Sequence, residues 1–305
     1  MNKPSSVSLM HDPVAWEYPK VIEFLSSQLL KGRLAVVLGA GASVGFGLPN
    51  WSRLTEELAA HVHCNLPPSL NDAQAGEYIL NELGNDYMAF AEAVRHVLYK
   101  DFRISMESLA RNPLLSAIGA LTMTSMRGRV GPVVSFNFDD LLERYLFYHG
   151  WVAAAVSSVP SWDGRSDVVV LHPHGLLRSD LSRPVLNPIV YAQIDFDRIV
   201  GNAQNTWRRK LLNVFTSNTC LFIGLSGNDA NLTNLLTECC ENHVSRNSSD
   251  AFWGVRFSAD HHDPMLSIWR ARGVCQLTVE EYSRVPSILF EICQGAAEVS
   301  QRLLT

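Results

Sequence analysis

The chain has 305 residues, of which 47% are hydrophobic and 18% charged, and its formal net charge at pH 7 is -5. This apolar content is ample for the core of a globular protein built as one large domain or two modest ones. The acidic balance and the lack of runs of like charge disfavour direct binding of nucleic acid.

The N-terminus, MNKPSSVSLMHDP, has one lysine and no apolar block, and no stretch approaches 18 consecutive apolar residues. We therefore expect a cytoplasmic protein without membrane contact. The six cysteines include no C-x-x-C pair, which excludes a zinc ribbon.

The first predicted elements frame a glycine-rich loop. Val21, Phe24 and Leu29 follow helical spacing, and the five apolar residues 34–38 predict a buried strand. This strand runs into a loop that contains Gly39, Gly41, Gly45 and Gly47. Successive glycines allow backbone N–H groups to converge on an anion, which is typical of a loop that binds a phosphate. The loop is not a P-loop, because no lysine follows its glycines, and Val44 stands where a G-x-G-x-x-G fingerprint needs its third glycine.

Beyond the loop, the pattern predicts a helix from about residue 54, capped by Asn50 or Ser52, and helices throughout 67–127. Strands are predicted at 130–135, 168–171, 220–223, 251–257 and 274–279, with helices at 141–146, within 187–217, at 232–236 and from 286 onward. Strands separated by helices favour an α/β fold, with a Rossmann-like parallel sheet, helices on both faces and an inserted helical subdomain. We expect a single domain over 1–305, with its core at about 20–62, 129–176 and 218–305 and the helical insertion at about 63–128 and 177–217.

Four of the six predicted strands end in polar or glycine-rich turns. These turns hold the Gly39 loop, Asn137 with Asp139, His172 with His174, and residues 224–229. Each turn has a structural alternative, since Asp139 or Asp140, for example, could cap the helix that follows. Because ligands bind at the carboxyl ends of parallel strands, four such turns at one sheet edge favour a ligand site.

The same residues carry a resemblance to the sirtuin family over nearly the whole chain. Gly39-Ala40-Gly41-Ala42-Ser43 with Gly47-Leu48-Pro49 is similar to the sirtuin signature, Asn137 and Asp139 to its Asn-x-Asp, His174-Gly175 to its His-Gly, and residues 224–226 to its Gly-Ser turn. Pro49-x-Trp51-x-x-Leu54, the Ser-Phe-Asn-Phe-Asp run and Asp229 after residues 222–226 resemble most the bacterial sirtuin-like domains of anti-phage defence systems. Protein deacylases instead carry a zinc ribbon and usually Asp-Phe-Arg where Asn50-Trp51-Ser52 stands here.

This resemblance implies an NAD+ glycohydrolase that cleaves the nicotinamide N-glycosidic bond and depletes cellular NAD during abortive infection. We expect His174 to act as general base toward a ribose hydroxyl or the attacking water, and Asn137 to orient the ribose or that water. Asp139 is expected to position the nicotinamide end or to brace the loop. The expected NAD-binding residues are Gly39, Ala40, Gly41, Ser43, Trp51, Gly224, Ser226 and Asp229. Of these, Gly39, Gly41 and Ser43 are expected to hold the diphosphate, and Ser226 and Asp229 to contact the adenosine ribose. NAD is expected as the substrate and no metal is expected, because Pro173 separates His172 from His174 and no third ligand is evident.

Three alternatives remain: a catalytically silent sensor of NAD or an NAD derivative, a structural subunit with an ancestral pocket, and an NAD-dependent deacylase. A free NAD-destroying enzyme would kill its host, and the catalytic fold leaves little room for an internal sensor. We therefore expect gating by a separate protein from the same defence operon or by assembly into a homo- or hetero-oligomer. The identity of that protein, the trigger, the stoichiometry, and the choice between hydrolysis and cyclisation of the product stay open.

Overall fold

A single seven-stranded parallel sheet forms the centre of the protein. The computed structural model describes residues 18–123, 129–159, 166–227, 229–244, 252–260 and 264–302. Within these ranges the strand order is β3-β4-β2-β1-β5-β6-β7, and every pairing is parallel. The strands are β1 (Leu34–Leu38), β2 (Val130–Ser135), β3 (Ala153–Val156), β4 (Val168–Leu171), β5 (Thr219–Ile223), β6 (Gly254–Ser258) and β7 (Val274–Thr278). The predicted Rossmann-like α/β fold is confirmed.

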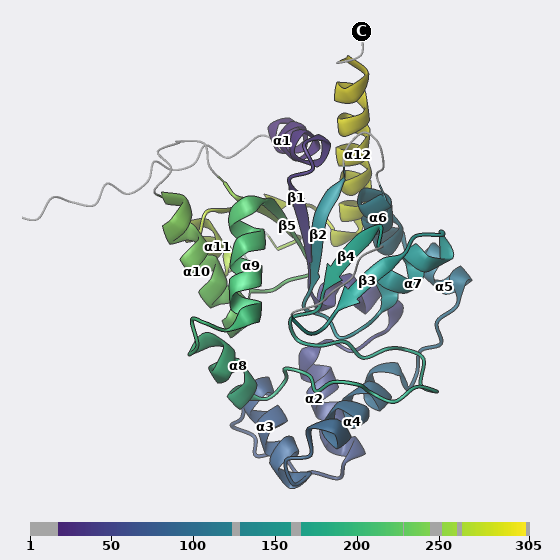
Figure 1. Cartoon of the computed structure of the whole chain (residues 1–305), viewed down its shortest axis with the longest axis vertical. Coiled ribbons are helices and arrows are strands. Elements are labelled where there is room, and N and C mark those ends of the chain that lie inside the picture. The colour runs from purple at the N-terminus through teal and green to yellow at the C-terminus, as the bar shows by residue number, and fades with distance from the viewer. Residues whose placement is uncertain are drawn as a thin grey trace, which may run out of the picture.

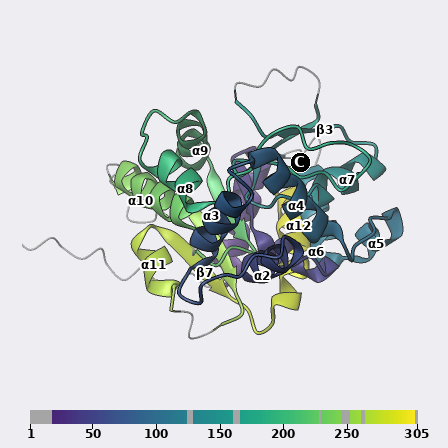
Figure 2. The same ribbon diagram turned by 90° about the horizontal axis from the view of Figure 1, so that it is seen from below.

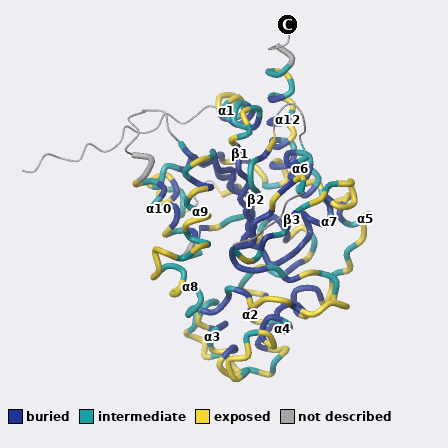
Figure 3. Tube along the Cα trace, viewed as in Figure 1, coloured by how far each residue is buried: buried dark blue, intermediate teal, exposed yellow. Residues whose placement is uncertain are grey.

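Helices cover both faces of the sheet (Figure 1). One face packs against α1 (Tyr18–Leu30), α6 (Pro113–Met123), α7 (Leu141–Tyr148) and α12 (Val285–Arg302). The other packs against α9 (Thr206–Ser217), α10 (Ala230–Val244) and α11 (Leu266–Ala271). Neighbouring residues of β1 therefore belong to different cores: Val36 to the first and Val37 to the second. This two-sided burial explains why the central strands are continuous apolar runs, and Figure 3 shows them as the buried centre of the molecule.

A group of helices lies across one end of the molecule. Figures 1 and 2 show α2 (Trp51–His61), α3 (Asp72–Glu82) and α4 (Tyr87–Tyr99) together there, at the end opposite the C-terminal end of α12. The short helix α5 (Met106–Arg111) packs against α6 and α7, and α8 (Gln193–Val200) packs against α3 and α10. The division into an α/β core and a helical insertion stays a prediction.

The sequence patterns located most elements and missed two short ones. Strand β3 was not predicted, because its sequence is Ala-Ala-Ala-Val and alanine has little preference for strands. The six-residue helix α11 was also missed. The predicted cap Asn50 does accept a hydrogen bond from the Arg53 N–H, at 2.9 Å. Residue 251, the predicted start of β6, and residues 124–127 of the predicted helical region lie outside the described residues.

No helix in the described ranges combines the length and the apolar character needed to cross a lipid bilayer.

The turns after β1 and β5 touch each other through their backbones. Gly224 has a φ of +73°, and a Cβ built on it would lie 2.3 Å from the Ala42 nitrogen. A Cβ on Gly41 would lie 2.7 Å from the Gly224 Cα. Hydrogen bonds from Gly39 N–H to the Ile223 carbonyl, 2.9 Å, and from Gly41 N–H to the Gly224 carbonyl, 3.0 Å, hold the turns together. Only glycines permit this approach.

We predict that Gly224→Ala lowers the free energy of unfolding by about 2 to 4 kcal/mol, since it combines a left-handed backbone with overpacking. Gly47→Ala is the matched control, because Gly47 also has a positive φ, +81°, but a Cβ there would meet nothing within 4 Å. That variant should lose only about 1 kcal/mol. Urea unfolding of both variants measures the difference, and equal losses would show that the backbone contact does not constrain residue 224.

Candidate active site

The site is formed by turns at the carboxyl ends of β1, β2, β4 and β5. In the sheet, β1 lies between β2 and β5, so the chain first continues to one side of β1 and later returns to the other. This reversal is the place where ligands bind in open parallel sheets. The predicted site residues on these four turns are therefore brought to one edge.

Asn137 connects the turns after β1 and β2. Its Nδ2 donates to the Gly39 carbonyl and to Ser43 Oγ, both at 3.0 Å. Ser43 Oγ in turn donates to Asp139 Oδ2 at 2.7 Å. Because both amide hydrogens of Asn137 are engaged, its carboxamide oxygen is the group it can offer to a ligand.

Asp139 is a buried carboxyl group with an altered proton affinity. Burial raises its pKa from 3.8 to about 6, against the opposing effect of hydrogen bonds from Ser43 and from the Leu141 N–H. The second of these bonds, 3.2 Å long, lies at the start of α7. Asp139 thus accepts from the first N–H of that helix, whose N-cap residue is Asp140 and makes no side-chain cap hydrogen bond.

His174 is 1% exposed and surrounded by aromatic rings. The ring centroids of Phe136, Phe196 and Trp51 lie 5.0, 5.4 and 6.3 Å from that of its imidazole. Within the described part of the chain, neither ring nitrogen makes a hydrogen bond of standard geometry, although the Asp229 carboxylate lies 3.4 Å from Nε2 and a backbone contact with Phe136 acts to raise the pKa of the imidazole. Burial lowers the pKa of His174, which keeps the imidazole neutral at neutral pH. Buried polar atoms without partners are rare and point to a ligand or a catalytic role.

Asp229 lies beside His174. Its Oδ2 is 3.4 Å from His174 Nε2, and its Oδ1 accepts from the Leu232 N–H at 2.8 Å, at the start of α10. The carboxylate acts to raise the pKa of His174, although burial outweighs it. The helix cap therefore holds a carboxylate in position to stabilise an imidazolium.

Trp51 belongs to an aromatic cover over His174. Its indole packs against Tyr191 and Phe196, with centroid distances of 5.1 and 5.7 Å. Its buried Nε1 has no hydrogen-bond partner within the described ranges. This predicted NAD-binding residue thus touches the predicted base and carries a second unused polar atom.

The glycine loop has a structural function of its own. The N–H groups of Gly39 and Gly41 donate to carbonyls of the β5 turn, and those of Ala42 and Ser43 donate to carbonyls within the loop. In this arrangement these four N–H groups are already used and cannot also donate to a diphosphate. From the glycine spacing alone, the N–H groups of this loop were expected to be free to bind a phosphate. The role of Gly39, Ala40, Gly41 and Ser43 in binding NAD stays a prediction.

Two cavities flank this edge of the sheet. One of about 630 Å³, in the usual size range of ligand sites, has walls from the turns after β1, β5 and β6. Its lining residues are Gly41, Val44, Gly224, Leu225, Ser226, Arg256, Phe257, Ser258, Ala259, Asp260, Pro264, Met265 and Tyr282. The other, of about 20 Å³, has space for roughly one water and is lined by Ser43, Asn137 and Asp139 among others. His174 lines neither of them.

His172 and His174 have different environments. His172 Nε2 lies 2.5 Å from Glu143 Oε1, whereas His174 faces Asp229. Among the described residues, no three or more His, Cys, Asp or Glu side chains come together as a metal site would require. Sequence reasoning also missed Glu143, Arg256 and Tyr282, because their approach to the site depends on tertiary contacts that no local spacing encodes.

The altered pKa of Asp139 predicts a pH-dependent stability. Because its folded pKa lies above the unfolded value, the stabilisation is complete below about pH 4 and is lost as the pH rises through about 6. Relative to Asp139→Asn, whose side chain does not titrate, the wild type should lose about 2.5 kcal/mol between pH 4 and 7. Urea unfolding of both proteins across this range is the measurement. Parallel stability curves would contradict a raised pKa.

Comparison with known proteins indicates the family to which part of this chain is similar. Residues 132–275 match the family model of the SIR2-like domain, a range that includes Asn137, Asp139, His172, His174 and Asp229. Over 221 residues, 72% of this chain, the sequence is 21% identical to NAD(+) hydrolase ThsA of Enterococcus faecium. The match covers 42% of that protein, so this chain spans about two fifths of its length. The chain therefore carries a SIR2-like domain.

Proposed function

We propose that this chain is an NAD+ glycohydrolase that cleaves the bond between nicotinamide and ribose. The observation that carries the proposal is the buried, neutral His174, whose ring nitrogens make no hydrogen bond of standard geometry in the described part of the chain. The imidazole lies beside the Asp229 carboxylate and on the sheet edge that also holds Asn137 and Asp139. The SIR2-like domain and the distant similarity to an NAD(+) hydrolase support the same substrate.

The chemistry requires little acid catalysis. Nicotinamide leaves a cationic ring as a neutral molecule, so the enzyme has to stabilise an oxocarbenium-like ribose and supply water. A neutral His174 accepts a proton from a ribose hydroxyl or from that water, and Asp229, 3.4 Å away, stabilises the imidazolium that forms. The Asn137 oxygen orients the ribose or the water, and Asp139 braces the nicotinamide end.

The larger cavity is suited to the adenosine half of NAD. It is lined by Gly41, which was expected at the diphosphate, by Ser226, which was expected at the adenosine ribose, and by Gly224. Its walls, which come from the turns after β1, β5 and β6, support this assignment. Asp229 was expected to contact that ribose as well, but its contact with His174 favours the role of orienting the imidazole.

Access to His174 supports a gated enzyme. The imidazole is 1% exposed beneath Trp51, Phe136 and Phe196, and neither cavity reaches it. NAD can therefore react only after the aromatic cover moves. We propose that a separate protein of the same defence operon, or assembly into an oligomer, opens the cover, and that the resulting loss of NAD serves anti-phage abortive infection.

The same closure favours one second candidate function. A protein that binds NAD or an NAD derivative only in the larger cavity, with His174 sealed, would be a silent sensor that regulates a partner. Calorimetry distinguishes the two functions, because a sensor shows saturable binding of NAD without release of nicotinamide.

We predict that His174→Ala lowers the rate of nicotinamide release by roughly 10² to 10⁴, the range for loss of a general base. Pure protein is mixed with NAD, alone and with the product of the neighbouring open reading frame, and nicotinamide is followed by chromatography. His96→Ala is the matched control, since His96 is an exposed imidazole on α4. Equal rates for wild type and His174→Ala would refute the assignment of the base.

Gating predicts that wild-type protein alone releases nicotinamide slowly and that activity rises together with complex formation. Size-exclusion chromatography with light scattering, run in parallel with the NAD assay, follows both quantities. A monomer with full activity and no partner would disprove the gating.

A further inference from the structure

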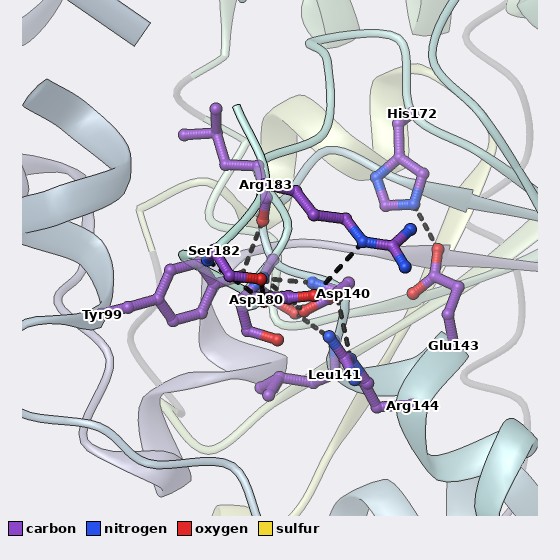
Figure 4. Close-up of polar contacts among 12 residues, drawn as sticks. Tyr99, Asp140, Leu141, Glu143, Arg144, His172, Asp180, Ser182 and Arg183 are labelled. Carbon is purple, nitrogen blue, oxygen red and sulfur yellow. Dashed lines mark hydrogen bonds and ion pairs between the residues drawn. The ribbon is translucent and has the colours of Figure 1, made fainter. Parts of the chain in front are cut away.

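Glu143 and His172 form a buried pair beside the proposed catalytic residues. His172 directly follows β4 and is 0% exposed, and Glu143 lies in the first turn of α7 at 9% exposure. Figure 4 shows the His172 ring pointing at the Glu143 carboxylate. The distance between His172 Nε2 and Glu143 Oε1 is 2.5 Å. Neither residue takes part in the mechanism described above.

The neighbours of the imidazole determine where its protons lie. Nδ1 of His172 is 3.2 Å from the Asn137 carbonyl oxygen. A carbonyl oxygen only accepts, so Nδ1 carries a hydrogen and donates. Nε2 faces a carboxylate oxygen, so a second proton lies between His172 and Glu143. The pair is therefore an imidazolium and a carboxylate sharing one proton, with no net charge.

The electrostatics of the pair agree with this proton count. Burial opposes a charge on His172, but the Glu143 carboxylate and its hydrogen bond outweigh burial and raise the pKa of the imidazole, with help from the Asn137 carbonyl and Asp139. Of the other buried carboxylates nearby, Asp140 has its own partners: Arg144 Nε at 3.2 Å and the Ser179 N–H at 3.1 Å. Figure 4 shows Asp140 between Tyr99 and Arg144, separate from the pair. His172 is thus the cation that faces Glu143 and Asp139.

The pair acts on the turn that carries Asn137 and Asp139. Its hydrogen bond to the Asn137 carbonyl fixes the main chain of the residue whose side chain holds Gly39 and Ser43. Glu143 also anchors the pair to α7, the helix that begins directly after Asp140. A shift of the imidazole would therefore move the Asn137 carboxamide and change the charge that Asp139 experiences.

We propose that Glu143 and His172 are positioning residues, which hold the Asn137–Asp139 turn in the geometry that the glycosidic cleavage needs. The catalytic part of this inference rests on the proposed function, because it assumes that the chain cleaves the glycosidic bond of NAD. The proton shared by Glu143 and His172 does not depend on that function and can be tested without any substrate. A purely structural ion pair would stabilise the fold and leave the catalytic rate of the folded protein unchanged.

The test compares Glu143→Gln with the wild type. Glutamine keeps the shape and a hydrogen bond to the imidazole but removes the negative charge. NMR titration of histidine-labelled protein, assigned with His172→Asn, should show His172 titrating above the ordinary range in the wild type and below it in Glu143→Gln, where burial dominates. An unchanged titration of His172 would overturn the proposed pair.

The second measurement is NAD cleavage under the conditions in which the wild type is active. Glu143→Gln should lower kcat by roughly tenfold to a hundredfold, the loss expected from a small misplacement, with KM little changed. Arg144→Gln is the matched control, because it removes the neighbouring ion pair between Arg144 and Asp140. The Arg144 side chain is 33% exposed, and this variant should keep the kcat of the wild type. Thermal unfolding shows that each variant is folded.

The outcomes separate the two proposals. A lowered titration of His172 together with an unchanged kcat would overturn positioning and leave the proposed function intact. Suppose instead that the wild type binds NAD but releases no nicotinamide, with or without the neighbouring gene product. This result would overturn both the proposed function and the positioning role. The NMR titration would still decide whether Glu143 and His172 share a proton.

Discussion

The backbone contact between the turns after β1 and β5 is the constraint on which the site depends. Gly39, Gly41 and Gly224 allow two main chains to approach at a distance that any Cβ would prevent. This contact fixes the Gly39 carbonyl, which accepts the hydrogen bond from Asn137, and Asn137 in turn orients Ser43. A steric property of three glycines at the reversal of strand order is thus transmitted through side-chain hydrogen bonds to the residues with the chemistry.

Burial then gives these residues their reactivity. Asp139, His172 and His174 are all almost inaccessible to water, yet their pKa values move differently because their partners differ. His172 has the carboxylate of Glu143 and is favoured as a cation, whereas His174 is surrounded by aromatic rings and is favoured as the neutral form. Two histidines separated by one proline thus acquire opposite proton affinities, which a common sequence motif could not indicate.

Individual elements show which features of the structure the sequence pattern could predict and which it could not. The apolar runs of β1 and β5 predicted buried strands because such runs are required where helices cover both faces of a sheet. The four turns with glycine, amide, carboxyl or imidazole groups do lie at one edge of the sheet, as their positions after parallel strands predicted. By contrast, the three alanines of β3 carry no strand signal, and this strand is recognised in the structure by its parallel pairing with β4. Glu143 resembled an ordinary residue of a helix surface, since its partner His172 is 29 positions away.

The sequence by itself determined the parallel α/β fold, the glycine loop and the identity of the residues at the strand ends, because these depend on local periodicity and on short motifs. Only the tertiary structure decided which groups became partners: Asp229 with His174, Glu143 with His172, and the glycine N–H groups with the β5 turn. It also decided that His174 is closed beneath aromatic rings. The physical reason is that hydrogen bonding and burial depend on distances between segments remote in the chain, whereas residue spacing reports only on neighbours.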